Sequence, residues 1–314
     1  MDWEIIQGLE KVPDSLRRGV LTVGNFDGVH LGHQRLLSVA ASLSASEDAK
    51  FCVLTFDPPP AVVLAPNRAP DYILPADVKY RLLAAAGPGA IVVVRTTTEF
   101  LAGTAEQFIR DVLVKYFEPK HLVEGPNFFF GRDRSGNVET LQEMSGRFGF
   151  DVTVVEPLEA RLPKRGAVHI SSSLVRDLIR AGDVADAALC LGRHFTLYGT
   201  VVTGCGHGRL LEFPTANVDP NGLICPGEGV YAAWADIQNE RYSSAVSVGA
   251  KPTFEMPSSK TIEVHLLDAA GNFYGSDIAV TFLSKLRDQQ AFPDTGALKA
   301  QIAKDVQRVR ELCE

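Results

Sequence analysis

The chain has 314 residues, of which 46% are hydrophobic and 22% are charged, and its formal net charge is −7. A chain of this length exceeds what one hydrophobic core usually serves, so we expect two domains. The negative charge argues against a broad basic surface, so we expect neither a nucleic-acid nor a membrane partner. Five scattered cysteines without a C-x-x-C pair, and an N-terminus without a secretory pattern, favour a reduced protein of the cytoplasm.

The first part of the chain alternates between apolar, β-rich runs and stretches of helical periodicity. The apolar runs predict strands at residues 19–24, 50–56, 90–95, 121–125 and 151–156. The periodic stretches predict helices at residues 32–45, 77–87, 104–117 and 171–182. Such alternation is typical of βαβ units, so we predict an α/β domain with a Rossmann-like, mostly parallel sheet covered on both faces.

The second part contains short strands separated by turn residues, at residues 195–204, 229–237, 242–249, 261–275 and 277–286. Without helices between them, these strands predict an antiparallel barrel or sandwich. Residues 296–314 predict a final helix with one apolar stripe that should pack on the strands: Leu298, Ile302, Val306, Val309 and Leu312. We place the N-terminal domain at residues 1–185 and the C-terminal domain at residues 186–314.

Residues 23–33, VGNFDGVHLGH, form the junction between the first predicted strand and the first predicted helix. Backbone N–H groups and the positive end of the helix dipole converge at such a junction, so phosphate is the expected ligand. The three glycines, at intervals of four, match neither the dinucleotide fingerprint nor the P-loop. His30 and His33 share one face of the helix start, where a bound nucleotide could keep them protonated to stabilise charge in a transition state.

Two other interpretations of these histidines are less favoured. A zinc site would need an H-E-x-x-H motif or a local Cys/His cluster, and the sequence offers neither. Helix-capping glycines with ordinary polar histidines would also explain the motif, but they do not account for its place directly after an apolar strand.

Polar features follow the first strand of the second part. Gly206 and Gly208 would let the backbone approach an anion closely, and Arg209 adds a positive charge, although glycines in a hairpin loop are often just a turn. Thr215 and Asn217 lie two residues apart and offer two oxygen ligands suited to magnesium. An Asx-turn would explain the same two residues without a metal.

The segment TIEVHLLD supplies a candidate general base. Ile262, Val264 and Leu266 would share one face of the strand, so Glu263 and His265 share the other. A carboxylate that accepts a hydroxyl proton is what phosphorylation of a hydroxyl requires. The alternative is an exposed or ion-paired glutamate on a strand.

Four segments of the first part resemble, in order, the motifs of the nucleotidyltransferase domain of bacterial bifunctional riboflavin kinase/FAD synthetases: GNFDGVHLGH, TFDPPP, EGPNFFFGRDRSGN and ISSSLVRDLI. Segments of the second part resemble the riboflavin kinase domain of the same family: FPTAN, GVYA, VGAKPTF, EVHLLD, FYG and FLSKLRDQQAF. The resemblance implies a six-stranded barrel in the second domain. It also implies phosphorylation of riboflavin to FMN there, and adenylylation of FMN to FAD in the first domain, with ATP as co-substrate and Mg²⁺ as cofactor.

The resemblance also implies roles for individual residues. ATP would be bound in the first domain by Gly24, Phe26, Asp27, Gly28, His30 and His33, with Ser172 and Arg176 closing on its phosphates. Asn127 would face flavin or phosphate. In the second domain, Gly206, Gly208 and Arg209 would bind nucleotide, Thr215 and Asn217 would bind magnesium and phosphate, and Glu263 would accept the proton of the ribityl hydroxyl.

Two of these segments also have purely structural interpretations. Arg176 would serve equally as an exposed ion pair on a helix. The three phenylalanines of NFFFG would serve as core residues. If they form a strand, Phe128 and Phe130 point to one side and Phe129 to the other.

Three positions depart from the family pattern. Pro59 stands where a histidine is usual, Leu174 where an arginine is common, and Glu212 where a glycine usually precedes F-P-T-A-N. These changes keep two alternatives open: an enzyme with one impaired domain, and a flavin-binding or flavin-sensing protein without turnover. We expect at most weak homo-oligomerisation.

Overall fold

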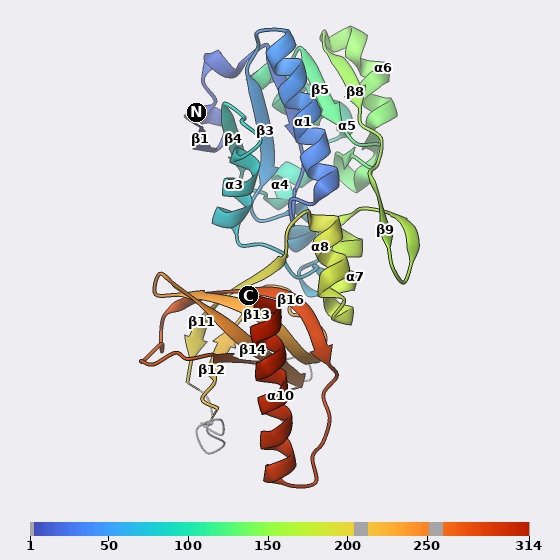
Figure 1. Cartoon of the computed structure of the whole chain (residues 1–314). Helices are drawn as coiled ribbons and strands as arrows, with labels where there is room; N and C mark the ends of the chain where they lie inside the picture. The colour runs from blue at the N-terminus through green and yellow to red at the C-terminus, as the bar shows by residue number, and fades with distance from the viewer. Residues whose placement is uncertain (1–2, 204–212, 251–259, 314) are drawn as a thin grey trace. The chain divides into compact units, whose positions relative to one another are not determined.

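The computed structural model describes residues 3–203, 213–250 and 260–313 (Figure 1). The chain divides into two compact units. The first comprises Met1–Pro70, Pro75–Ala160 and Ala167–Ile170, and the second comprises Asp71–Leu74, Arg161–Gly166 and Ser171–Glu314. Residues 171–185 thus belong to the second unit, and the functional boundary after residue 185 stays a prediction.

A six-stranded sheet with the order β1-β4-β3-β2-β5-β8 forms the centre of the first unit. Each pair of neighbouring strands is parallel. The strands are β1 (Glu4–Gln7), β2 (Val20–Val23), β3 (Phe51–Phe56), β4 (Ala90–Val94), β5 (His121–Glu124) and β8 (Asp151–Val154). This arrangement confirms the predicted parallel sheet.

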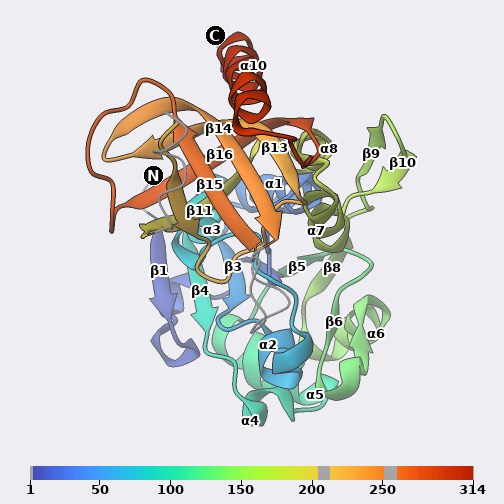
Figure 2. The same cartoon turned by 90° about the horizontal axis from the view of Figure 1, so that it is seen from below.

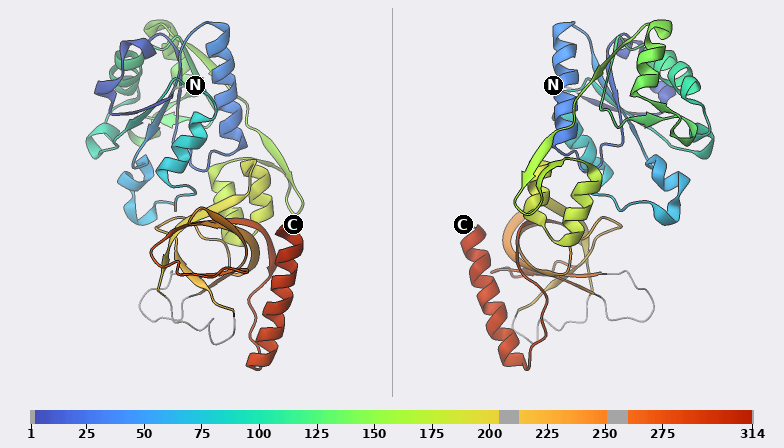
Figure 3. Two further views of the ribbon diagram at one scale, coloured as in Figure 1. Left: turned by 60° about the vertical axis from the view of Figure 1, so that its left-hand side comes forward. Right: turned by 90° about the vertical axis from the view of Figure 1, so that its right-hand side faces the viewer.

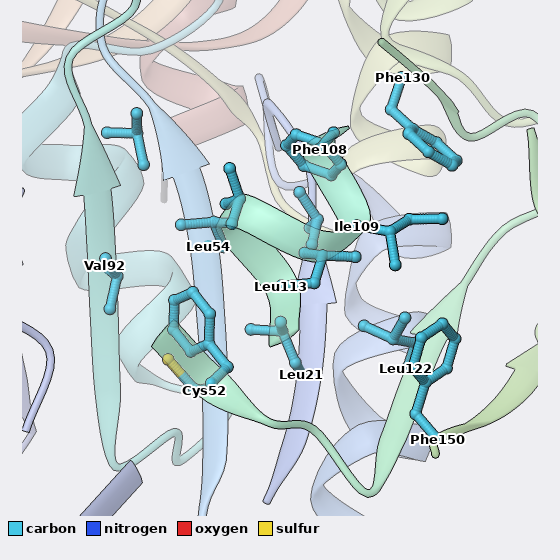
Figure 4. Packing of buried hydrophobic residues seen from close by; sticks show 14 of the residues in the cluster. Leu21, Cys52, Leu54, Val92, Phe108, Ile109, Leu113, Leu122, Phe130 and Phe150 are labelled. Atoms are coloured by element: carbon cyan, nitrogen blue, oxygen red, sulfur yellow. The ribbon is translucent and has the colours of Figure 1, made fainter. Parts of the chain in front are cut away.

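The three central strands β2, β3 and β4 are buried along their whole length, because helices cover both faces of the sheet. On one face, Leu21, Leu54 and Val92 pack against Ile109 and Leu113 of the helix that follows α5 (Figure 4). Helix α1 (Leu31–Ser46) contacts β2, β3 and β5. The continuous apolar runs in the sequence therefore reflect burial on both faces.

The remaining helices of the first unit follow the strands in the sequence. They are α2 (Pro60–Leu64), α3 (Ala76–Ala84), α4 (Thr98–Leu101), α5 (Ala105–Phe108) continuing into η4 (Ile109–Phe117), and α6 (Val138–Phe148). Single turns occur at η1 (Leu9–Lys11), η2 (Asp14–Leu16), η3 (Pro66–Arg68) and η5 (Arg132–Arg134). Two short hairpins pair β6 (Phe129–Phe130) with β7 (Gly136–Asn137) and β9 (Glu159–Leu162) with β10 (Gly166–His169).

The second unit contains a closed barrel of six strands in the order β11-β12-β15-β14-β13-β16 (Figures 2 and 3). All of its neighbouring strands are antiparallel. The strands are β11 (Phe195–Val202), β12 (Ala216–Asp219), β13 (Gly229–Ile237), β14 (Glu240–Ala250), β15 (Lys260–Leu266) and β16 (Asp277–Arg287). The barrel confirms the fold class expected for the second domain.

The described residues of the second unit include the helices α7 (Ser172–Ala181), α8 (Val184–Leu191) and α10 (Thr295–Cys313). Helix α10 packs on the barrel through Val306, Val309 and Leu312, as the apolar stripe predicts. The Arg287 guanidinium donates to the buried Asp305 carboxylate at 2.8 Å, so a charge pair also joins β16 to this helix.

The described residues contain no disulfide bond. Cys52, Cys190, Cys225 and Cys313 are free thiols, whereas Cys205 lies outside the described residues. Within the described ranges, no helix has the length and apolarity needed to cross a bilayer.

Candidate functional site

The loop between β2 and α1 carries the first predicted site. His30 is the N-cap of α1, and Gly28 has a φ of 82°, a left-handed conformation that favours glycine. A Cβ atom at Gly32 would lie 3.2 Å from Cε1 of the His30 ring. Any larger residue at position 32 would therefore crowd this ring. The motif therefore sets the position of His30 at the carboxyl edge of the sheet.

The two histidine rings form a stacked pair. Their centroids are 3.6 Å apart and their planes differ by 17°. The backbone N–H of His33 donates to Nδ1 of His30 at 3.3 Å. Because Nδ1 of His30 accepts this bond, Nε2 is the ring nitrogen that can carry a donor N–H.

Without a bound ligand, the protein disfavours a positive charge on the His33 ring. Burial, together with the neighbouring His30, lowers the pKa of the His33 imidazole well below its usual value. Nδ1 of His33 is shielded from solvent and has no hydrogen-bond partner among the described residues. The structure thus favours a neutral His33 ring, and protonation of the two histidines by a bound nucleotide stays a prediction.

Other residues of the loop are buried around this pair. Phe26 is 3% exposed, and its ring meets the His33 ring edge-on at a centroid distance of 5.3 Å. Asp27 is 7% exposed. In the structure Phe26 therefore supports the His33 ring from within, and its contact with ATP stays a prediction.

An apolar cavity of about 360 Å³ lies in the same unit. Its walls include six phenylalanines: Phe56, Phe100, Phe108, Phe128, Phe129 and Phe130. Phe130 is buried and stacks on the half-buried Phe128 at 5.3 Å, whereas Phe129 is 42% exposed. The predicted alternation of these three side chains is confirmed, and they serve both as core and as cavity wall.

The remaining residues predicted for the ATP and flavin site are Asn127 in the first unit and Ser172 and Arg176 in the second. Asn127 is exposed in the turn before Phe128. Ser172 and Arg176 stand on α7, where the Arg176 Nε donates to the backbone carbonyl of Asp71 at 2.9 Å. The structure thus brings the residues from Gly24 to His33 together in the β2–α1 loop and the first turn of α1, and it places Ser172 and Arg176 in the other compact unit.

Pro59 precedes α2, and its pyrrolidine ring contributes no hydrogen bond to the cap of this helix. A histidine at this position would add a polar ring close to the end of β3. The effect of the substitution on turnover stays a prediction.

Glu124 is a buried carboxyl beside the loop that the sequence analysis did not identify. It ends β5, is 2% exposed, and accepts a hydrogen bond from the Val23 N–H at 2.7 Å. Burial raises the pKa of Glu124 well above its usual value, against the opposing effect of this bond. A charged residue at the end of the apolar run HLVE was the signal that could have found it.

We expect Glu124→Gln to change how stability depends on pH. Because the folded-state pKa is raised, wild-type stability is fully present below the unfolded pKa and is lost as pH rises toward the folded pKa, at up to about 1.4 kcal/mol per pH unit. Glutamine keeps an acceptor for Val23 without titrating, so the variant gains stability relative to wild type as pH rises from about 4.5.

The measurement is denaturant unfolding from pH 4.5 to pH 8. Trp3 and Trp234 lie in different units, so a Trp234→Phe background lets Trp3 fluorescence report the first unit. Parallel stability curves for the two proteins would contradict the expectation.

The second predicted site lies on the outer face of the barrel. Strand register places Asn217 of β12 directly opposite Glu263 of β15, and Ser247 of β14 opposite Glu263 on its other side. Cross-strand neighbours have their Cβ atoms about 5 Å apart. Ile262 and Val264 face the core, as predicted, so Glu263 lies on the opposite face with an amide and a hydroxyl as neighbours.

Further contacts hold this surface in place. Nδ1 of His265 donates to the Pro214 carbonyl at 2.8 Å and so fixes the segment that contains Thr215. The Gln289 amide donates to Oγ of Ser247 at 2.9 Å and to the Val248 carbonyl at 3.1 Å. No role for Ser247 or Gln289 was predicted from the sequence.

The oxygen-rich character of this surface fits magnesium. Thr215, Asn217 and Glu263 offer hydroxyl, amide and carboxylate oxygens, which are the ligands that this hard cation prefers. Among the described residues, no group of three or more His, Cys, Asp or Glu side chains could hold a metal by itself. A cation that is shared with substrate phosphates fits this donor set. Gly206, Gly208, Arg209 and Glu212 lie outside the described residues.

Comparisons with known proteins identify the family. A family model for FAD synthetase matches residues 12–173, and one for riboflavin kinase matches residues 191–313. The bifunctional riboflavin kinase/FMN adenylyltransferase of Escherichia coli (strain K12) is 36% identical over 98% of this chain and 97% of its own length. The chain belongs to the bifunctional riboflavin kinase/FMN adenylyltransferase family. The relative of the same name from Bacillus subtilis (strain 168) is 33% identical and covers 94% of this chain and 93% of its own length.

Membership confirms the resemblance drawn from the motifs. The chain contains both enzymatic domains, FAD synthetase and riboflavin kinase. Riboflavin, FMN, FAD and ATP are the substrates and products that fit these activities. A Streptococcus pneumoniae crystal structure described as a macrolide-efflux protein superimposes with a TM-score of 0.86 at 28% identity, covering 99% of both chains. This likeness supports the fold of the whole chain.

Proposed function

We propose that the two reactions use separate sites, one around the start of α1 and one on the barrel. The observation that carries the proposal is the strand register that sets Asn217 and Ser247 on either side of Glu263. A carboxylate among neutral polar neighbours on a barrel face is placed to act on a hydroxyl substrate. The stacked histidines at the start of α1 provide the corresponding polar site of the first unit.

In the barrel site, the terminal ribityl hydroxyl of riboflavin attacks the γ-phosphorus of ATP. The new oxygen–phosphorus bond forms as the bond to the β-phosphate oxygen breaks, and ADP leaves. Glu263 accepts the hydroxyl proton. Thr215 and Asn217 would hold Mg²⁺, which, when bound, draws charge from the phosphate oxygens.

In the first unit, a phosphate oxygen of FMN attacks the α-phosphorus of ATP, and pyrophosphate leaves. The N–H groups of His30 and His33 stabilise the charge that develops on the phosphate oxygens. The resemblance assigns Ser172 and Arg176 of α7 to phosphate binding as well, and a guanidinium fork pairs well with phosphate oxygens. Asn127 contacts the flavin or its phosphate.

The phenylalanine-lined cavity holds the isoalloxazine ring of FMN. Its volume of about 360 Å³ lies within the usual range for small-molecule sites, and its aromatic walls suit a flat aromatic ligand. Magnesium dependence, a cytoplasmic location and weak self-association complete the proposal.

Incubation of the protein with riboflavin, ATP and magnesium, followed by chromatographic separation of the flavins, tests this function. We expect FMN to appear first and FAD to follow. Formation of FMN alone, or conversion of added FMN alone, would identify one impaired domain. Bound but unchanged riboflavin would identify a flavin-binding protein and overturn the proposal.

A further inference from the structure

Lys79 is a buried lysine that has no part in the two proposed reactions as described above. It lies on α3 and is 7% exposed. Its Nζ donates to Oγ1 of Thr55 and to the Phe56 carbonyl, both at 3.4 Å, so it reaches the carboxyl end of β3. Among the buried side chains that the structure describes, it is the sole lysine or arginine. Burial of an ammonium group is unfavourable unless nearby negative charge offsets it.

Two aspartates provide that negative charge. Asp57 directly follows Phe56, and its Oδ2 accepts from the Tyr80 hydroxyl at 3.4 Å. Asp27 follows β2, which pairs in parallel with β3 through Val23 and Leu54. Burial lowers the pKa of Lys79, and Asp57 and Asp27 oppose this lowering. The ammonium group therefore lies within electrostatic reach of the loops that follow two neighbouring strands.

This arrangement matters because Asp27 belongs to the loop proposed to bind ATP. Asp27 is 7% exposed, so solvent screens its charge poorly. A triphosphate that approaches this loop would meet a repelling carboxylate unless a fixed positive charge offsets it. Lys79 reaches the end of β3, the strand next to β2, and can supply that charge from there.

We propose that Lys79 is a positioning residue of the adenylyl-transfer site. Its ammonium group holds the end of β3 and offsets the charge of Asp27, so that the loops after β2 and β3 accept the ATP triphosphate. This inference rests on the proposed function, in which the loop from Gly24 to His33 binds ATP for FAD formation.

Lys79→Met keeps most of the length of the side chain and removes its charge. We expect the KM for ATP in the conversion of FMN to FAD to rise about tenfold, with a smaller change in kcat, because substrate approach rather than chemistry is affected. Formation of FMN in the barrel serves as an internal control and should not change. Lys115→Met is the matched control, since Lys115 also lies over the ring of the tyrosine that follows it but is exposed.

A double-mutant cycle separates charge from space filling. In an Asp27→Asn background, Lys79→Met should raise the KM for ATP by about twofold or less, because the carboxylate that needs compensation is gone. The same tenfold increase in both backgrounds would show that Lys79 acts without Asp27 and would overturn the proposal. An unchanged KM in Lys79→Met alone would also overturn it.

Folding is monitored by Trp3 fluorescence in the Trp234→Phe background. If Lys79→Met unfolds the first unit, the Asp27→Asn/Lys79→Met protein, in which both charges are removed, decides the matter. A folded double variant with the ATP KM of Asp27→Asn supports the proposal, and unfolding of both variants shows that Lys79 serves the fold alone. If His30→Ala leaves FAD formation unchanged, the proposed function fails, whatever Lys79 does.

Discussion

Replacement of Glu263 with glutamine is expected to lower the rate of FMN formation from riboflavin by about 10²- to 10⁴-fold, the usual contribution of a general base. Glutamine keeps the size and hydrogen-bonding capacity of the side chain but cannot take the hydroxyl proton. Conversion of added FMN to FAD should not change, because that reaction is placed in the other unit. Chromatography of riboflavin, FMN and FAD from the same incubations measures both rates.

The surroundings of Glu263 make this prediction specific. Its cross-strand neighbours Asn217 and Ser247 are uncharged, so the substitution breaks no ion pair with them. Glu240→Gln is a suitable control because Glu240 also lies on a barrel strand, where it accepts a hydrogen bond from the Tyr242 hydroxyl. Wild-type FMN formation by Glu263→Gln would remove Glu263 from the mechanism while leaving the family assignment intact.

The sequence was most informative for strands that are buried on both faces of the sheet. Strands β2, β3 and β4 are buried on both faces, so they read as unbroken apolar runs. Strand β1 was missed because only Ile6 of its four residues is buried at the edge of the sheet. Strand β12 was missed because the residues after Pro214 resemble a turn, and it forms through pairing with β11 and β15, which local propensity does not encode.

The candidate sites show the same limit. Alternation along β15 placed Glu263 and His265 on one face, but the opposition of Asn217 and Glu263 depends on register between distant segments. Lys79 was missed because a lysine in a helix is normally exposed. The fully buried Leu83, one turn further along α3, marks the face on which Lys79 lies and could have revealed it.

Loss of either imidazole at the start of α1 should strongly reduce FAD formation. We expect His30→Ala and His33→Ala each to lower kcat for the conversion of FMN to FAD by about 10²- to 10³-fold, as loss of a donor to a transition-state oxygen usually does. FMN formation from riboflavin should be retained in both variants. His169→Ala is the control, since His169 lies in the same unit but is exposed on β10.

The double variant should lose little more than either single variant. The rings stack at 3.6 Å and His30 accepts from the His33 N–H, so each histidine holds the other and their effects are not additive. Strictly multiplicative losses would indicate two independent contributions.

His30 also caps α1, and this second role has to be separated from catalysis. His30→Ala removes the N-cap acceptor, which should cost about 1 kcal/mol of stability. His30→Asn restores a side-chain acceptor without the imidazole, so we expect wild-type stability with FAD formation still lost. If His30→Asn recovers FAD formation, His30 serves only as the N-cap of α1 and has no role in catalysis. If the histidine variants instead lost FMN formation and kept FAD formation, the two reactions would have been placed in the wrong units.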